Sequence, residues 1–256
     1  RLDVADELPV DLLQQMRQAV KRQNPDGTLL GEVWEDASNK VSYGRLRSYC
    51  LGDTLDSVMN YPLRRAIIDF FTHKVGSEVV AKLILHQREV YPAPFFYALM
   101  NLLGSHDRVR ILNAMAGYDR EGAIQMPRDE AAKVVLTDEQ LSKAKDRYLE
   151  AVKLLCAIPG APTIYYGDEM GMQGMADPWN RAPMEWNHGD AVLWSSISTL
   201  LNRRQSQRVL QTGFLSIEVP DDDTLIIKRF ARDGKDVFGE PLDEDGVCVT
   251  ITRNGK

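Results

Sequence analysis

The apolar positions of the chain follow two different spacings, and these predict its secondary structure. An apolar residue at every third or fourth position predicts amphipathic helices, and this spacing occurs in residues 8–20, 62–71, 77–89, 138–155 and 190–206. Short continuous apolar runs predict buried strands, and these occur at residues 28–34, 55–60, 95–103 and 162–166. Helices that alternate with buried strands are typical of an α/β fold with a parallel sheet.

Turn and cap signals mark the limits of several elements. Asn24-Pro25-Asp26-Gly27 predicts a turn after the first helix. Thr137-Asp138-Glu139-Gln140 has the form of a capping box and predicts a helix start. The polar or glycine-rich stretches that remain predict long loops, at residues 38–54, 117–136 (with Gly122) and 170–187.

A different pattern begins after Gly213. Apolar and polar residues alternate there, which predicts strands with one buried face, at residues 214–219, 225–227 and 247–251. Asp-rich turns such as Asp221-Asp222-Asp223 separate these strands. We therefore expect two units, an α/β unit at residues 1–210 and an all-β unit at residues 211–256.

Composition and charge narrow the class of protein. With 256 residues the chain can form one large core or two domains. The net charge of −6 argues against nucleic acid as the main partner, because phosphate binding needs a basic surface. No apolar run approaches the ~18 residues of a membrane helix, and no signal peptide is visible. Cys50, Cys156 and Cys248 are scattered and odd in number, which favours free thiols in a reducing compartment. We expect a cytoplasmic, bacterial protein with no membrane partner.

Three acidic residues occupy similar positions in the pattern. Asp3, Glu32 and Asp107 each follow a short apolar stretch. If these stretches are strands of a barrel, the acids lie at the carboxyl ends of the strands, where barrel enzymes keep their catalytic residues. A single acid in such a place is more often a solvated surface residue, but three of them favour a functional site.

The residues around these acids resemble the motifs of a known family. Arg1-Leu2-Asp3, Gly31-Glu32-Val33-Trp34 and Ser105-His106-Asp107 are similar to the ends of strands 4, 5 and 7 in the α-amylase family of glycoside hydrolases, family 13. The resemblance is nearest to its neopullulanase, cyclomaltodextrinase and maltogenic-amylase branch, and it covers roughly residues 1–210. It implies the second half of a (β/α)₈ TIM barrel, from the end of strand 4 to helix 8. Residues 211–256 would then be the start of the C-terminal β-sandwich domain.

The resemblance also implies a role for each acid. Asp3 would be the nucleophile, Glu32 the general acid/base and Asp107 the residue that stabilises the transition state. Cleavage with retention needs two carboxyl groups ~5–5.5 Å apart, one to attack the anomeric carbon and one to move the proton. The expected activity is a retaining hydrolysis of α-glucosidic bonds in α-glucans or maltooligosaccharides.

Six further residues are candidate substrate-binding residues. Arg1 would share one strand face with Asp3, and His106 would hydrogen-bond a sugar hydroxyl. Trp34 could stack on a sugar ring. Asp177 and Arg181 resemble a late substrate-binding motif of the family, although their spacing also fits a surface ion pair.

The sixth candidate, Glu7, fits the branch, whereas the preceding Asp6 departs from its usual Asn. This departure leaves open whether the protein cleaves α-1,4 or α-1,6 bonds. It also leaves open whether the sugar is transferred to water or to another sugar. The alternatives are a glucosyl transferase or isomerase with the same acids, or a non-catalytic glucan-binding or scaffold fragment.

Cofactors and partners follow from the same resemblance. It implies no organic cofactor, and the sequence shows no spacing of metal ligands. The segment that binds calcium in several family members would lie upstream of Arg1. The expected partners are an α-glucan or maltooligosaccharide, the N-terminal half of the barrel and a second copy of the chain in a homodimer.

Overall fold

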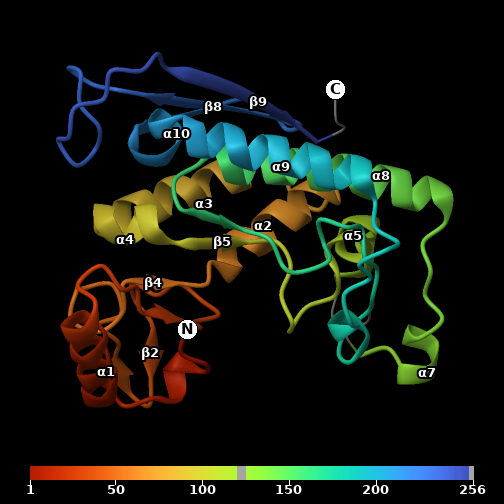
Figure 1. Ribbon diagram of the computed structural model, residues 1–256, viewed down its shortest axis with the longest axis horizontal. Coiled ribbons are helices and arrows are strands. Elements are labelled where there is room, and N and C mark those ends of the chain that lie inside the picture. The colour runs from red at the N-terminus through yellow and green to blue at the C-terminus, as the bar shows by residue number, and fades with distance from the viewer. Residues whose placement is uncertain (120–124, 254–256) are drawn as a thin grey trace.

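The computed structural model describes residues 1–119 and 125–253, and five parallel extended segments pair within it, of which Figure 1 labels β4 and β5. Leu2 pairs with Gly31 of β1 (Leu30–Gly31), and β1 pairs with β4 (Ser57–Val58). Met59 then pairs with Met100 of β5 (Met100–Leu102), and β5 pairs with β6 (Ala161–Thr163). Every pair is parallel, and neighbours in space follow each other along the chain. The carboxyl ends of all five segments therefore lie along one edge.

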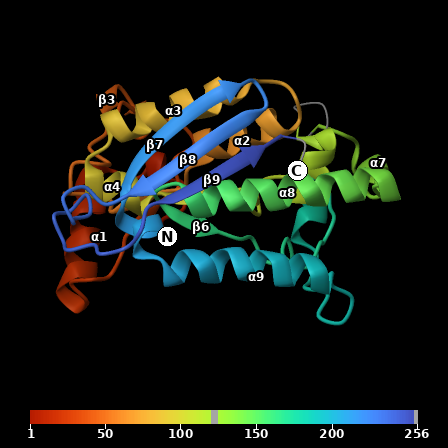
Figure 2. The ribbon, with the colours of Figure 1, turned by 90° about the horizontal axis from the view of Figure 1, so that it is seen from above.

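Long helices connect and cover these strands (Figures 1 and 2). They are α1 (Val10–Gln23), α2 (Tyr61–Phe71), α3 (Ser77–Val90), α8 (Asp138–Ala157) and α9 (Ala191–Ser206). The predicted capping box is present, because the Thr137 side chain accepts from the backbone of Gln140 and the Gln140 side chain accepts from the backbone of Thr137. Asn60 caps α2 through Leu63 N, and Asp190 caps α9. Local side-chain chemistry thus fixes where these helices begin.

Shorter elements complete the connections. They are η1 (Ala5–Glu7), the hairpin β2 (Val41–Ser42) and β3 (Arg45–Leu46), α4 (Ala93–Ala98), α5 (Ile111–Asn113), η2 (Ala114–Tyr118), α7 (Arg128–Ala131), η3 (Trp179–Arg181) and α10 (Arg208–Thr212). The hairpin lies in the stretch 38–54 that was predicted as a loop. Gly122 of the second predicted loop lies outside the described residues.

One predicted strand is wrong over most of its length. Residues 95–103 were expected to be a single strand, but Phe95 and Phe96 lie in α4, and only Met100–Leu102 is extended. Both phenylalanines are buried, so this part of the run is apolar because it belongs to a buried helix. Pro94 in the first turn suits a helix start. A continuous apolar run does not by itself separate a buried helix from a buried strand.

The C-terminal residues form an antiparallel sheet, as the alternating pattern predicted. It consists of β7 (Phe214–Asp221), β8 (Thr224–Phe230) and β9 (Val247–Thr252), with β8 in the middle. The sheet runs across α3 and α8 (Figure 2). Leu225, Ile227, Val249 and Ile251 belong to the same apolar core as residues of the helices. The two predicted units therefore share one continuous core.

Two buried arginines, one from α9 and one from this sheet, bind carbonyl groups at and just after the end of α8. Arg204 of α9 donates to the carbonyl oxygens of Cys156 (2.8 Å) and Gly160 (2.5 Å). Arg229 of β8 donates to the carbonyl oxygen of Ala157 (2.9 Å). Carbonyl groups at the end of a helix lack partners within the helix and carry partial negative charge. The two guanidinium groups therefore satisfy the last turn of α8 directly before β6 begins.

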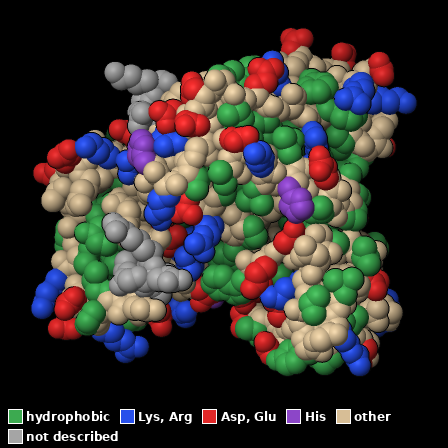
Figure 3. All heavy atoms as spheres, turned by 180° about the vertical axis from the view of Figure 1, so that it is seen from behind, with side chains coloured by type: hydrophobic (Ala, Val, Ile, Leu, Met, Phe, Trp, Pro, Cys, Tyr) green, Lys and Arg blue, Asp and Glu red, His purple; other side chains and the backbone are tan. Residues whose placement is uncertain are grey.

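The structure also shows the state of the cysteines, the distribution of surface charge and the character of the helices. Cys50 and Cys156 are buried, Cys248 is exposed, and all three are free thiols. Lys, Arg, Asp and Glu side chains are interspersed over the face shown in Figure 3. None of the helices formed by residues 1–119 and 125–253 combines the length and apolarity needed to cross a membrane.

Candidate active site

Arg1 joins the first two predicted acids. Leu2 N donates to Leu30 O (2.7 Å) and Glu32 N to Leu2 O (3.0 Å), so the N-terminal segment runs beside β1. Arg1 Nη1 lies 2.8 Å from Asp3 Oδ1, and its Nη2 lies 3.0 Å from Glu32 Oε2. The side chain of Asp3 is 71% exposed, whereas that of Glu32 is 5% exposed. Two carboxyl groups on one guanidinium thus have very different environments.

The buried carboxylate of Glu32 has a second partner in the backbone. Val4 N donates to Glu32 Oε2 at 2.9 Å. Val4 adopts a left-handed conformation with φ +43°, which is a rare and costly conformation for a β-branched residue. This conformation directs the N–H toward the Glu32 carboxylate. Sequence reasoning missed Val4, because a backbone donor leaves no signal in residue type.

The third predicted acid lies in a cluster with three other predicted residues. His106 Nε2 lies 3.0 Å from Asp107 Oδ2, and Arg181 Nη2 lies 3.3 Å from Asp107 Oδ1. Arg181 Nε also lies 3.2 Å from Asp177 Oδ1. Asp177 and Arg181 therefore form the ion pair that their spacing also allowed, and Arg181 reaches Asp107 as well. Asn180 fixes the turn, because its amide donates to the carbonyl oxygens of His106 (2.6 Å) and of Arg108.

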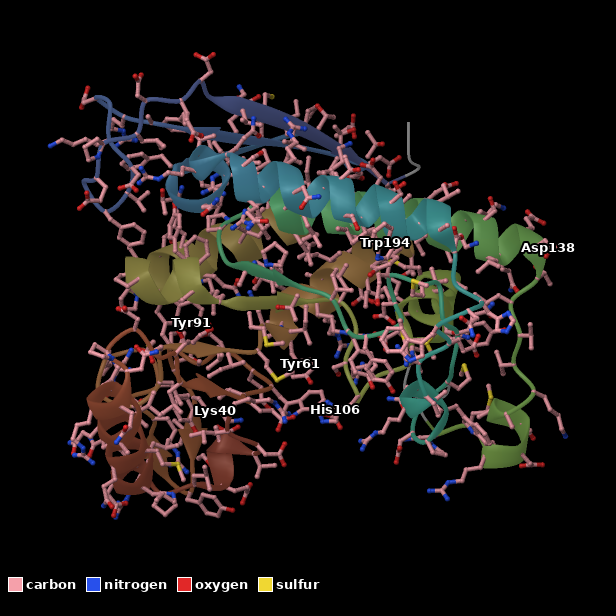
Figure 4. The ribbon with its side chains drawn as sticks, in the orientation of Figure 1. Lys40, Tyr61, Tyr91, His106, Asp138 and Trp194 are labelled. Carbon is pink, nitrogen blue, oxygen red and sulfur yellow. The ribbon has the colours of Figure 1, made fainter. Side chains whose placement is uncertain are left out.

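Tyr61 connects the two segments that carry Glu32 and Asp107, and sequence reasoning missed it. Its ring stacks on Trp34 with centroids 4.0 Å apart and planes at 7°. Its hydroxyl donates to Ser105 Oγ at 3.3 Å. Burial raises the pKa of the Tyr61 phenol, and the nearby charges of Asp107 and Glu32 raise it further. Tyr61 and His106 lie near one another in Figure 4. Tyr61 follows β4 as the acids follow their strands, and this position was the available signal.

The segment after Asp3 is bound to the β2–β3 hairpin. The Glu7 carboxylate accepts a hydrogen bond from the Tyr43 hydroxyl. The Asp6 carboxylate accepts from the Tyr49 hydroxyl at 2.6 Å and pairs with Lys40 at 3.3 Å. Asp6, which departs from the branch pattern, therefore has a structural role in holding the hairpin.

A buried acid lies beneath the Asp107 turn. Asp168 Oδ1 lies 3.3 Å from Arg110 Nη1, and both side chains are buried. A Cβ at Gly104 would lie only 2.0 Å from Asp168 Oδ2, so the glycine allows this close approach. Burial raises the pKa of Asp168 to about 7, against the opposing charge of Arg110. Arg110 also lies over the rings of Tyr165 and Tyr166, at 4.6 Å from each centroid.

The chemistry of the site is that of carboxylates, an imidazole and guanidinium groups. Across the described stretches, no three or more His, Cys, Asp or Glu side chains gather closely enough to hold a metal ion. An exposed carboxylate, a buried carboxylate and a third beside His106 and Arg181 can supply a nucleophile, a proton carrier and a stabilising charge.

Comparison with known proteins places this chain in a family. The profile described as "Alpha amylase, catalytic domain" matches residues 8–208. The chain belongs to the α-amylase family of glycoside hydrolases. This confirms the family inferred from the three motifs, and family membership implies a TIM-barrel catalytic domain.

Relatives of this chain have names from the expected branch. An amylopullulanase of Thermoanaerobacter thermohydrosulfuricus is 36% identical over 270 residues, which is all of this chain and 17% of the relative. A cyclomaltodextrinase of Bacillus sp. is 30% identical over 98% of this chain and 39% of the relative. A solved structure titled cyclomaltodextrinase has a TM-score of 0.74 at 30% identity, with 98% of this chain and 36% of that chain covered. The chain thus spans well under half the length of these relatives.

The buried Asp168 leads to a prediction about pH. Its pKa of about 7 lies above the ordinary value of 3.8, so between these values the unfolded chain is ionised while the folded carboxyl holds its proton. The free energy of unfolding should therefore fall as the pH rises from about 4 to 7, by at most about 4 kcal/mol from this group. In Asp168→Asn this contribution is absent. The melting temperature of the variant should fall less between pH 4.5 and pH 7 than that of the parent.

The exposed Asp233 supplies the control for this measurement. Asp233→Asn should keep the pH dependence of the parent, since it leaves Asp168 intact. An Asp168→Asn variant with the same pH dependence as the parent would show that Asp168 is ionised throughout this range.

Proposed function

We propose that this chain carries the catalytic acids of a retaining glycoside hydrolase that cleaves α-glucosidic bonds in α-glucans or maltooligosaccharides. The observation that carries the proposal is that the three acids follow three different parallel segments, whose carboxyl ends lie along one edge. Arg1 contacts both Asp3 and Glu32, and Tyr61 contacts Trp34 and Ser105, which lie two residues from Glu32 and Asp107 in the chain. The relatives named above are glycoside hydrolases, and their names support an α-glucan as the substrate class.

The proposed reaction has two steps. In the first, a carboxylate oxygen of Asp3 attacks the anomeric carbon while Glu32 donates its proton to the leaving oxygen, which releases one sugar as an alcohol. In the second, Glu32 takes a proton from water, and that water displaces Asp3 from the anomeric carbon. Asp107 balances the positive charge that develops on the sugar ring in each step.

The environments of the acids suit these roles. Asp3 is exposed and can reach a substrate carbon, while Glu32 is buried and has fixed hydrogen-bond partners in Arg1 and Val4. His106 and Arg181 hold Asp107 through both of its oxygens. Such fixed positions reduce the reorganisation that the transition state requires. Transfer to a sugar acceptor would use the same covalent intermediate and stays an alternative outcome of the second step. Loss of the acids would favour a non-catalytic scaffold, but all three are present.

We further propose that residues 1–210 are the second half of the (β/α)₈ barrel and that residues 211–256 begin the following β-sandwich. The support is the order of the five parallel segments, with Leu2 at one end and β6 at the other. A complete barrel of this type has eight strands. On this proposal the partner of the chain is the upstream half of its own barrel. A cytoplasmic location, a homodimer and the lack of an organic cofactor stay predictions from the sequence.

Replacement of Glu32 tests the proton transfer. In the intact protein, Glu32→Gln should lower turnover of maltotriose by ~10²–10⁴-fold, because the leaving oxygen loses its proton donor. The release of fluoride from α-maltosyl fluoride in the first step should slow far less, since fluoride leaves without a proton. Glu35→Gln is the control, because Glu35 is exposed and pairs with Lys40. Equal losses on both substrates would contradict the role of Glu32.

Covalent labelling tests the nucleophile. A fluorinated α-glucosyl fluoride that slows the second step should leave the sugar bonded to Asp3, and mass spectrometry of the digested protein should find the label there. Asp3→Asn should take up no label, whereas Asp11→Asn, at an exposed position in α1, should take up as much as the parent. A label on Asp107 would reverse the assignment.

Complementation tests the half barrel. Purified residues 1–256 should associate or aggregate in light scattering and should show almost no turnover, because strand edges that pair in a closed barrel are left open. Addition of the upstream half should restore turnover of maltooligosaccharides. A soluble monomer with full turnover would overturn this proposal.

A further inference from the structure

We propose that Tyr43, at the tip of the β2–β3 hairpin, forms a platform for the sugar on the leaving-group side of the scissile bond, with its hydroxyl fixed by Glu7. The inference rests on the proposed glycoside hydrolase function and names a residue that governs the choice between water and a sugar acceptor. Tyr43 is an exposed aromatic residue at the tip of the hairpin. Its setting in the structure gives it a specific place.

The hairpin is bound firmly to the segment that carries the proposed nucleophile. Ser42 Oγ donates to Asp6 O at 3.0 Å, and Arg47 Nη2 donates to the same oxygen at 2.6 Å. Lys40 and Tyr49, on either side of the hairpin, both contact the Asp6 carboxylate. Because these contacts come from both ends of the hairpin, its tip has a fixed position relative to η1. Figure 4 shows Lys40 beside this segment.

The tip itself has an unusual residue for its conformation. Tyr43 and Gly44 form a two-residue turn, and both have positive φ, +52° and +70°. Turns of this kind favour Asn or Asp before Gly, because these residues adopt the left-handed region with little strain. Tyr43 is 72% exposed, so packing does not compensate for the strain. Strained backbone conformations cluster at active sites and at sites that bind ligands.

The position of Glu32 identifies the side of the bond. As the proton donor, Glu32 must lie against the oxygen that joins the two sugars, so the leaving sugar extends from Glu32 outward. Val4 N donates to the Glu32 carboxylate at 2.9 Å, and Ala5 N donates to Glu32 O at 3.2 Å. The chain from Val4 onward therefore lies beside Glu32 and leads through η1 to Glu7. Asp107 and His106, on the turn after β5, form a separate cluster with Arg181 of η3.

The chemistry of the pair suits a glucose ring. An aromatic ring offers a flat apolar surface for the C–H face of a sugar, and its position is held when a polar tip is bonded. The carboxylate of Glu7 accepts a hydrogen bond from the Tyr43 hydroxyl. It can accept further hydrogen bonds, such as one from a sugar hydroxyl. When a sugar is bound against Tyr43, it can attack the covalent intermediate in place of water, so binding at this position favours transfer over hydrolysis.

The test measures how the covalent intermediate is partitioned. The intact protein is supplied with α-maltosyl fluoride as donor and with maltose as acceptor, and chromatography gives the ratio of transfer product to hydrolysis product. This ratio does not depend on the amount of folded enzyme. Tyr43→Asn keeps a turn that tolerates positive φ and removes the ring, so the ratio should fall ~10-fold, which corresponds to ~1.4 kcal/mol of acceptor binding. Tyr43→Phe keeps the ring and loses the bond to Glu7, so the ratio should take an intermediate value.

Leu46→Ala is the matched control, because Leu46 lies on the same hairpin and is also exposed. Its ratio should equal that of the parent. If Tyr43→Asn also gives the parent ratio, the inference is overturned while the hydrolase function stands. If the parent releases no fluoride from α-maltosyl fluoride, the proposed function is overturned and this inference with it.

Discussion

Parallel pairing of short strands in their chain order is the constraint on which the candidate site depends. Each strand contributes only two or three residues of regular pairing, yet the direction of pairing decides where the next residues lie. Because all five segments point the same way, Asp3, Glu32, Tyr61 and Asp107 follow their strands at a common edge. An antiparallel neighbour would have sent one of these side chains to the opposite end of the sheet.

Around this edge, charge is organised by a few arginines that each contact several groups. Arg1 holds two of the proposed catalytic carboxylates, and Arg181 holds Asp107 together with Asp177. Arg110 connects Asp168 to the turn that carries Asp107. A planar guanidinium with five N–H donors suits such multiple contacts. The result is a site in which the proposed catalytic acids have fixed positions before any substrate binds.

The sequence predicted the parts of this structure that depend on side-chain type and spacing. The capping box at Thr137 and the period of the long helices are such local features. The motifs around Glu32 and Asp107 are local as well, and the family they indicated is confirmed. The prediction of a strand at 95–103 was wrong because buried residues such as Phe95 and Phe96 give the same apolar run in a helix. Val4, Tyr61 and the β2–β3 hairpin were missed because their roles arise from backbone conformation and from contacts between distant segments.

Arg229 connects the C-terminal sheet to the end of α8, directly before the strand that leads toward the site. Arg229 from β8 and Arg204 from α9 hold the carbonyl groups from Cys156 to Gly160, and β6 starts at the next residue. β6 in turn leads to Asp168 and, through the loop after it, to Arg181. The boundary near residue 210 therefore separates two patterns of sequence but not two independent bodies. Such coupling would make the sheet and the preceding α/β residues change together in evolution, and a sheet transplanted from a relative would have to bring an arginine at the position of Arg229.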